Sequence, residues 1–132
     1  MAYEKPGMCH TFPQGGDLTS NQYKFVKLNS SGQVVVIAAD TDNPIGIQQD
    51  VPNSTATGSS VQIMFEGISK VQGDADLAKG AYVGTSADGQ AIALVHGTDT
   101  TKYIIGQVID DNTAAGGFAT IVFDCRAAGR AA

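Results

Sequence analysis

The chain has 132 residues, enough for one domain or for two small halves that share one core. Hydrophobic residues make up 42% of it, but charged residues only 16%, below the roughly 25% of an average globular protein. The net charge is −5 and the Lys and Arg residues are scattered, so neither nucleic acid nor an anionic membrane surface is an expected partner.

The N-terminal residues 1–16 are rich in Pro and Gly and are predicted to form an extended arm outside the domain. This arm is expected either to be disordered or to dock into grooves on a partner protein. In the second case the contacts with the partner would come from side chains spaced along it: Tyr3, Lys5, Met8 and Phe12. Deleting residues 1–16 is then expected to leave the rest of the chain folded.

The central part of the sequence contains an internal duplication. The segment 25–38 (FVKLNSSGQVVVIA) has a counterpart at 82–95 (YVGTSADGQAIALV), and the turn glycine Gly89 lies 57 positions after Gly32. Further landmarks keep nearly the same offset: Asp17-Leu18 with Asp76-Leu77, Ile45-Gly46 with Ile105-Gly106, and Val61 to Phe65 with Ala119 to Phe123. Two copies indicate a duplicated domain rather than a solenoid. We therefore expect one β domain over residues 17–124, with halves at about 17–66 and 76–124.

Each half is predicted to consist of a hairpin, a further strand, a loop and a final strand. The final strands alternate, with Val61, Ile63 and Phe65 on one face of the first and Gln62 and Met64 on the other. The second repeats this pattern, with Ala119, Ile121 and Phe123 on one face and Thr120 and Val122 on the other. The expected fold class is all-β, a small barrel or sandwich with extended N- and C-terminal arms. A helix is expected only as one turn at residues 74–79.

The apolar run that starts at Val34 could be buried on both faces, and its counterpart helps to orient it. Large residues occur in both copies at Val35 and Ile92 and at Ile37 and Leu94, so these positions are predicted to face the core. Val34 and Val36 would then face outward. Outward valines form either isolated apolar spots or part of an oligomer interface.

The C-terminal residues 125–132 form a short-chained, lightly basic tail. The sequence starts without the apolar segment of a secretion signal, which favours synthesis in a reducing cytoplasm. We therefore expect Cys9 and Cys125 to be reduced thiols rather than a disulfide.

No catalytic constellation is recognisable in the sequence. His10 and His96 lie far apart in loop-like sequence, and no nucleophile elbow or phosphate-binding loop is present. The segment 40–43 (DTDN) begins like a calcium loop but lacks the glycine and glutamate that complete one, so we expect a solvated acidic loop. The chain is predicted not to be an enzyme and to use no metal or cofactor.

Several short motifs carry a resemblance to a known family. In order along the chain they are Asp17-Leu18, Ser31-Gly32, Ile45-Gly46-Ile47, the segment 67–71 (GISKV), Asp88-Gly89 and Ile105-Gly106. Over about residues 17–123 the sequence resembles the capsid cement, or head decoration, proteins of tailed bacteriophages.

This resemblance implies a homotrimer that binds the major capsid protein on the outer surface of the virion, after assembly in the host cytoplasm. The alternative is a carbohydrate- or receptor-binding β module of a virion. Such modules usually display aromatic side chains in a groove, whereas the four tyrosines of this chain are scattered along the sequence.

Overall fold

The computed structural model describes residues 5–126 and 128–132, and these residues form an all-β fold without a helix. The strands that lead up to residue 64 are β1 (Lys5–Pro6), β2 (Cys9–Pro13), β3 (Phe25–Leu28), β4 (Val34–Val36), β5 (Gly46–Gln48) and β6 (Ser60–Met64). Those that follow are β7 (Glu66–Gln72), β8 (Tyr82–Thr85), β9 (Ala91–Leu94), β10 (Tyr103–Ile104), β11 (Gly106–Asp110), β12 (Phe118–Asp124) and β13 (Gly129–Arg130). Within the described ranges, no helix is long and apolar enough to cross a bilayer.

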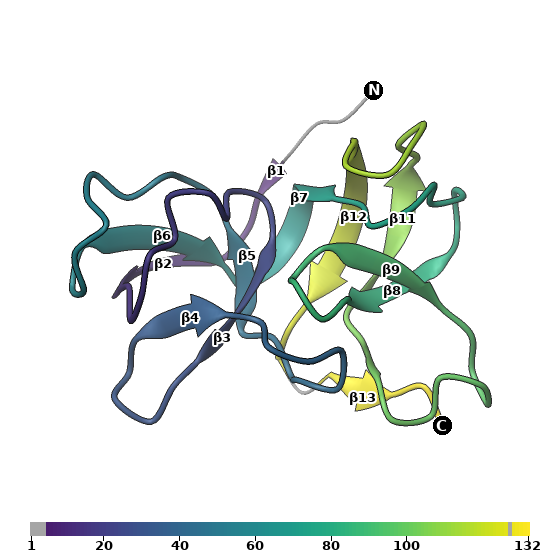
Figure 1. The fold of residues 1–132 in the computed structure, drawn as a ribbon. Helices are drawn as coiled ribbons and strands as arrows, with labels where there is room; N and C mark the ends of the chain where they lie inside the picture. The colour runs from purple at the N-terminus through teal and green to yellow at the C-terminus, as the bar shows by residue number, and fades with distance from the viewer. Residues whose placement is uncertain (1–4, 127) are drawn as a thin grey trace.

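The two main sheets repeat one topology. The first has the strand order β2-β6-β5-β3-β4, and the second has the order β7-β12-β11-β8-β9 with β1 added outside β7. The strand pairs are antiparallel, and in each sheet one isolated parallel bridge, Gln14–Val34 or Gly73–Ala91, links the end of the first strand to the last strand. The sheets therefore curl, and they lie side by side in a sandwich-like arrangement (Figure 1).

This topology confirms the duplication and shows that it begins earlier in each half than the landmarks indicated. Strands β2 and β7 occupy equivalent places, because Cys9 pairs with Met64 in the first sheet and Ile68 pairs with Val122 in the second. Both strands lie before the predicted starts of the halves at residues 17 and 76. From here on, the first half is the unit that contains β2 to β6, and the second half is the unit that contains β7 to β12.

Each half surrounds an equivalent set of five buried side chains. In the first half these are Leu18, Val26, Val34, Val61 and Ile63. In the second half the counterparts are Leu77, Val83, Ala91, Ala119 and Ile121. The cluster of the second half continues into the first half, where it includes Phe25, Ile37, Ile47 and Met64. The halves are therefore joined by a shared apolar core rather than by a linker.

The prediction that Val34 faces outward is wrong, because its side chain has 0% exposed surface and belongs to the core of the first half. Val36 does face outward, with 47% of its surface exposed. The predicted core residue Ile37 is buried, whereas Val35 is only half-buried.

The reason is that buried positions in this segment lie three residues apart rather than two. Residues 34–37 and 91–94 show the same order of buried, half-buried, exposed and buried positions. Side chains three apart on a strand point to opposite faces. Val34 enters the core of the first half and Ile37 enters the core shared between the halves, so both faces of this segment are covered.

The described part of the N-terminal segment is extended and pairs with its own chain. Strand β1 lies beside β7 and β2 lies beside β6, so residues 5–13 contribute to both sheets. Gly7 fits between them because a side chain there would overlap the carbonyl of Glu66. At the other end β13 pairs with β10, and Ala131 is fully buried.

The helical turn expected at residues 74–79 does not form. The side chain of Leu77 enters the core, and its backbone N–H donates to Oδ1 of Asn112 at 2.8 Å. The Nδ2 group of Asn112 in turn donates to the carbonyls of Ala75 and Ala114. Because a side chain from another loop satisfies the backbone here, the segment does not need helical hydrogen bonds.

In the first half, the buried amide is that of Gln14. This residue follows β2, whereas Asn112 lies between the last two strands of the second half. Gln14 is fully buried; its amide donates to the carbonyls of Ser54 and Ala56, and its oxygen accepts from the N–H of Leu18. The counterpart of Gln14 is Gly73, where a Cβ would lie 2.4 Å from Nδ2 of Asn112. Each half therefore has space for one buried amide at this place.

Candidate functional site

The acidic segment 40–43 is held by internal contacts. Asp42 forms an ion pair with Lys27 at 2.9 Å and accepts hydrogen bonds from the N–H groups of Ala38 and Ala39. Partial burial acts to raise the pKa of Asp42, but the hydrogen bonds from Lys27 and the two N–H groups outweigh it and hold the pKa below the ordinary value. Its carboxylate therefore closes a turn.

The other candidate ligands are also distributed over the molecule. In the first half, His10 packs edge-on against Phe12 and is stacked with Phe65. In the second half, His96 packs edge-on against Tyr82. Among residues 5–126 and 128–132, no three His, Cys, Asp or Glu side chains lie together in a way that could hold a metal ion.

The two cysteines form no disulfide, although both contact the shared core. Burial, and to a smaller degree the charge of Asp124, raises the pKa of the Cys125 thiol far above its usual range. Cys125 is therefore a packed core side chain rather than a nucleophile.

Of the four capsid-contact candidates in the N-terminal segment, the structure describes the side chains of Met8 and Phe12. Tyr3 lies outside the described residues, and Lys5 is placed only as part of β1. Met8 is exposed, whereas Phe12 is half-buried against the core of the first half. Of these two described side chains, Met8 is therefore the one that is open to solvent.

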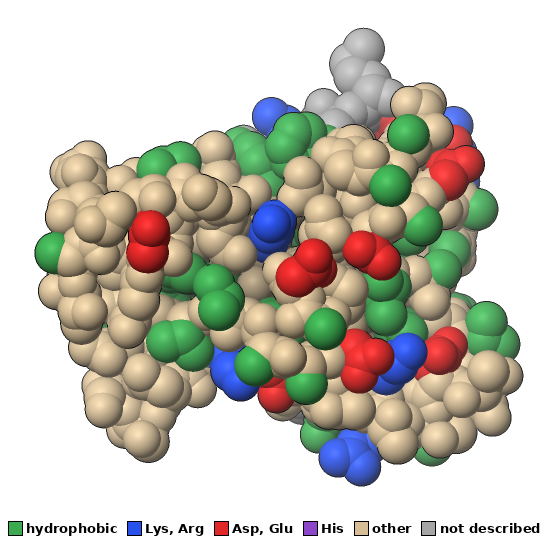
Figure 2. Space-filling view, viewed as in Figure 1, with side chains coloured by type: hydrophobic (Ala, Val, Ile, Leu, Met, Phe, Trp, Pro, Cys, Tyr) green, Lys and Arg blue, Asp and Glu red, His purple; other side chains and the backbone are tan. Residues whose placement is uncertain are grey.

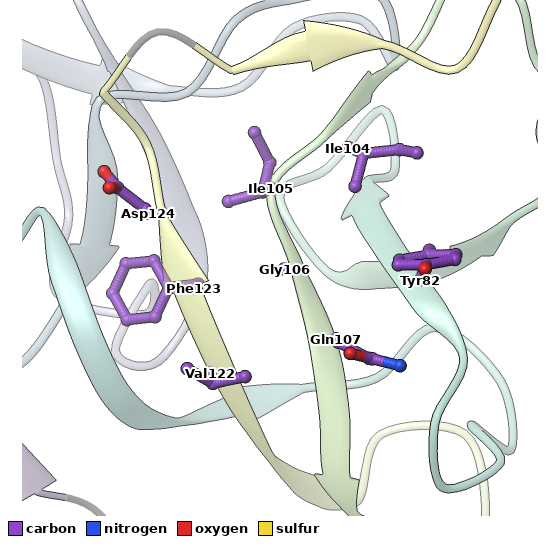
Figure 3. Close-up of a pocket in the computed structure, with 8 residues that line it drawn as sticks. All are labelled: Tyr82, Ile104, Ile105, Gly106, Gln107, Val122, Phe123 and Asp124. Carbon is purple, nitrogen blue, oxygen red and sulfur yellow. The ribbon is translucent and has the colours of Figure 1, made fainter.

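A pocket of about 320 Å³ lies on the outer face of the second sheet. Its lining residues come from β8, β11, β12 and the adjoining connections: Tyr82, Ile104, Ile105, Gly106, Gln107, Val122, Phe123 and Asp124. Three of them form a row across neighbouring strands, since Tyr82 pairs with Gln107 and Gln107 pairs with Val122 (Figure 3). Tyr82 and Val122 are 45% and 44% exposed.

The floor of this pocket depends on a glycine. A Cβ at Gly106 would lie 2.3 Å from the carbonyl oxygen of Val122, so a larger residue would push β11 away from β12. Gly46 has the same relation to the carbonyl of Met64 in the first sheet. This close approach of strands is the physical reason for the repeated Ile-Gly landmark.

The chemistry of the pocket suits an apolar side chain of another protein. The amide of Gln107 donates to the carbonyl of Gly80, and Asp124 is paired with Arg126 at 3.3 Å. The hydrogen bonds from Arg126 hold the pKa of Asp124 below its ordinary value. Because these polar groups already have partners, the apolar surfaces of Tyr82 and Val122 are what remains for binding.

One residue of this surface was predicted from the sequence. Strand alternation placed Val122 on the face opposite Ala119, Ile121 and Phe123, as the structure confirms. Tyr82 and Gln107 were not recognised as its neighbours, because the pairing of β8 with β11 is not encoded in any local pattern. On the face shown in Figure 2, basic side chains lie apart from one another.

The fold places the chain in the class of duplicated all-β domains. No protein-family model matches the sequence, and no curated protein matches it. Among solved structures, the chain is similar to the crystal structure of the head fiber gp8.5 N base of bacteriophage phi29. The TM-score is 0.66 at 15% sequence identity, and the match covers 89% of this chain and 96% of that one. The similarity therefore includes both halves and establishes a common fold.

Proposed function

We propose that this chain is a bacteriophage capsid decoration protein that binds the outer surface of the major capsid protein lattice, as a homotrimer, and stabilises the head. The observation that carries the proposal is the fold shared over nearly the whole chain with the base of a phage head fiber. The motif order that resembles head decoration proteins supports it independently, since that resemblance rests on sequence alone.

We further propose that its work is binding rather than catalysis, in a virion assembled in the host cytoplasm. The described residues suit such a role, because the charged groups around the pocket and the acidic turn are already engaged in internal pairs. A trimer would present three capsid-binding segments at once. Tethering raises the effective concentration of the second and third segments, so weak single contacts give firm attachment.

The segment with Tyr3, Lys5 and Met8 is the proposed capsid contact. Met8 supports this assignment, because it is a large apolar side chain that is exposed to solvent between β1 and β2, each of which is paired with another strand. An exposed methionine adapts its shape to a partner at low cost.

The proposal is tested by mixing the purified chain with heads assembled from the major capsid protein of the same genome. The chain is expected to sediment with the heads and to appear as added density on their outer surface by cryo-electron microscopy. Met8→Asp is expected to weaken binding at least ten-fold. Val51→Asp is the matched control, because Val51 has the same exposed fraction, 47%, and lies in a loop of the first half. Heads that remain bare at saturating protein would refute the proposal.

A carbohydrate- or receptor-binding module of a virion remains the alternative. Tyr82 offers an aromatic surface in the pocket, but its polar neighbours Gln107 and Asp124 already have internal partners. Glycan binding on an array, abolished by Tyr82→Ala, would favour the alternative over capsid decoration.

A further inference from the structure

Equivalent rows of side chains on the two sheets differ in their exposure to solvent. In the first sheet, Phe25 pairs with Ile47 and Ile47 pairs with Met64. In the second sheet the same strand pairings give the row Tyr82, Gln107 and Val122. Because the topology is duplicated, these rows are the same face of the same unit. We call them the first row and the second row.

The first row is buried in the joint between the halves. Phe25, Ile47 and Met64 have almost no exposed surface and belong to the core cluster of the second half. Polar contacts cross the same joint: the N–H of Phe25 donates to the carbonyl of Gly89, and the amide of Gln49 donates to Oγ of Ser69. The chain itself thus shows what this face of the unit binds, namely another copy of the unit.

Among the described residues, the second row is not buried against another unit. Tyr82 and Val122 keep almost half of their surface exposed, and Ile104 is half-buried beside them. Tyr82 and Val122 lie on either side of Gln107 and, with Ile104, line one pocket. Apolar surface gathered in this way marks an interaction site more often than an isolated exposed residue does.

We propose that the second row docks onto the first half of a second copy of this chain, head to tail. This deepens the self-association within the proposed function. The identity of the partner is inferred from the internal joint, in which the first row of one half contacts the other half. Continuing the same relation, the second row of one copy meets the first half of the next.

The receiving surface on the first half is open at the corresponding positions. The second half contributes Val71, Ile105 and Phe123 to the core cluster that takes up the first row. The equivalent residues Phe12, Ile45 and Phe65 are only half-buried. They carry apolar and aromatic surface that a second copy would cover.

His10 identifies where a second copy would contact this surface. It pairs with Ile63 as Ser69 pairs with Ile121, so His10 and Ser69 are equivalent. Ser69 is the residue that Gln49 contacts across the internal joint, at 3.1 Å. His10 is exposed and packs against Phe12 and Phe65.

The contact between copies is weaker than the joint within a chain. Gln107 replaces Ile47 at the centre of the row, and its amide is bonded to the carbonyl of Gly80. A heterologous contact of this kind closes into a ring when its rotation permits and otherwise forms filaments. A trimer is the closed ring of three copies.

The test measures the mass of the full chain in solution by light scattering and sedimentation over a range of concentrations. The wild-type chain is expected at three times the chain mass, and Val122→Asp at the chain mass. Val51→Asp, equally exposed to within a few per cent but outside both surfaces, is expected to keep the wild-type mass. Gln107→Ile, which restores the residue of the first row, is expected to lower the dissociation constant at least ten-fold. Circular dichroism checks that each variant is folded.

The direction of the contact is tested with His10→Glu on the receiving surface. Head-to-tail docking predicts that this variant is also monomeric, and that mixing it with Val122→Asp gives dimers, because one intact surface of each kind remains. A monomeric wild-type chain at every concentration, an unchanged mass of Val122→Asp, or an unaffected His10→Glu would each overturn the proposal. These measurements contain no capsid, so their failure leaves the capsid-binding test standing.

Discussion

Phe25 offers a quantitative test of the joint between the halves. Its ring has no exposed surface and lies in the core cluster that both halves contribute to. Replacing it with alanine removes a buried aromatic ring and leaves a cavity, which costs about 3–5 kcal/mol. A domain of this size is typically stable by about 5–15 kcal/mol, so the loss is a large share of the total.

Tyr82 is the matched position in the second half. It occupies the same place in the repeat, but 45% of its surface is exposed. Tyr82→Ala removes an edge-on contact with His96 and part of a solvent-facing surface, so the expected loss is only about 1 kcal/mol. The backbone pairing of β8 with β9 and β11 is retained in this variant.

Both variants are made in the Val122→Asp background, which the proposed contact between copies leaves monomeric, and are compared by urea unfolding followed by circular dichroism. The expected result is a clear fall in the midpoint for Phe25→Ala, a small fall for Tyr82→Ala, and an unchanged slope in both. Phe25→Leu keeps most of the apolar volume and is expected to lose roughly 1–2 kcal/mol, which provides a measurement if the alanine variant does not fold. Equal losses at Phe25 and Tyr82 would refute the different roles of the two rows.

Three further outcomes are expected. Asn112→Ala removes the acceptor for the buried N–H of Leu77 and should lower the free energy of unfolding by about 2–3 kcal/mol in a urea titration. A loss under about 0.5 kcal/mol would contradict the stabilising role of the Asn112 hydrogen bonds. The pKa of Asp42 is lowered in the folded state, so its stabilising ion pair with Lys27 is complete above pH about 4 and is lost as the pH falls through the folded-state pKa. The free energy of unfolding of Asp42→Asn should therefore decline less steeply below pH about 4 than that of the wild type. Deleting residues 1–16 should abolish cooperative unfolding, because it removes a whole strand of the first sheet; a sharp thermal transition in the truncated chain would show that this strand is dispensable.

The last of these outcomes reverses an expectation drawn from the sequence. Pro and Gly in residues 1–16 indicated an arm outside the domain, because such residues usually interrupt regular structure. The structure instead places Pro13 at the end of β2, an edge strand whose outer N–H groups need no partner in the sheet. A sequence pattern therefore showed where the backbone is irregular, but not where the segment lies.

The same distinction holds for the segment that begins at Val34. The duplication correctly predicted that residues 34–37 and 91–94 behave alike, and both show the same burial pattern. Which residues are buried could not be read from alternation, because a second core covers the other face of the segment. Local periodicity assumes one buried face, and the packing of two halves violates that assumption.

The sequence by itself determined the all-β class, the duplication and the turns, since these depend on alternation, glycine placement and repeated order along the chain. It also placed Val122 on the outer face of its strand. Only the tertiary structure decided that the first row is buried in the joint and the second row is exposed. The physical reason is that both rows occupy the same strand positions, and the change from Ile47 to Gln107 does not by itself show which unit packs against which. The duplicated topology builds the equivalent face twice, and among the described residues only the first row is covered by the other half.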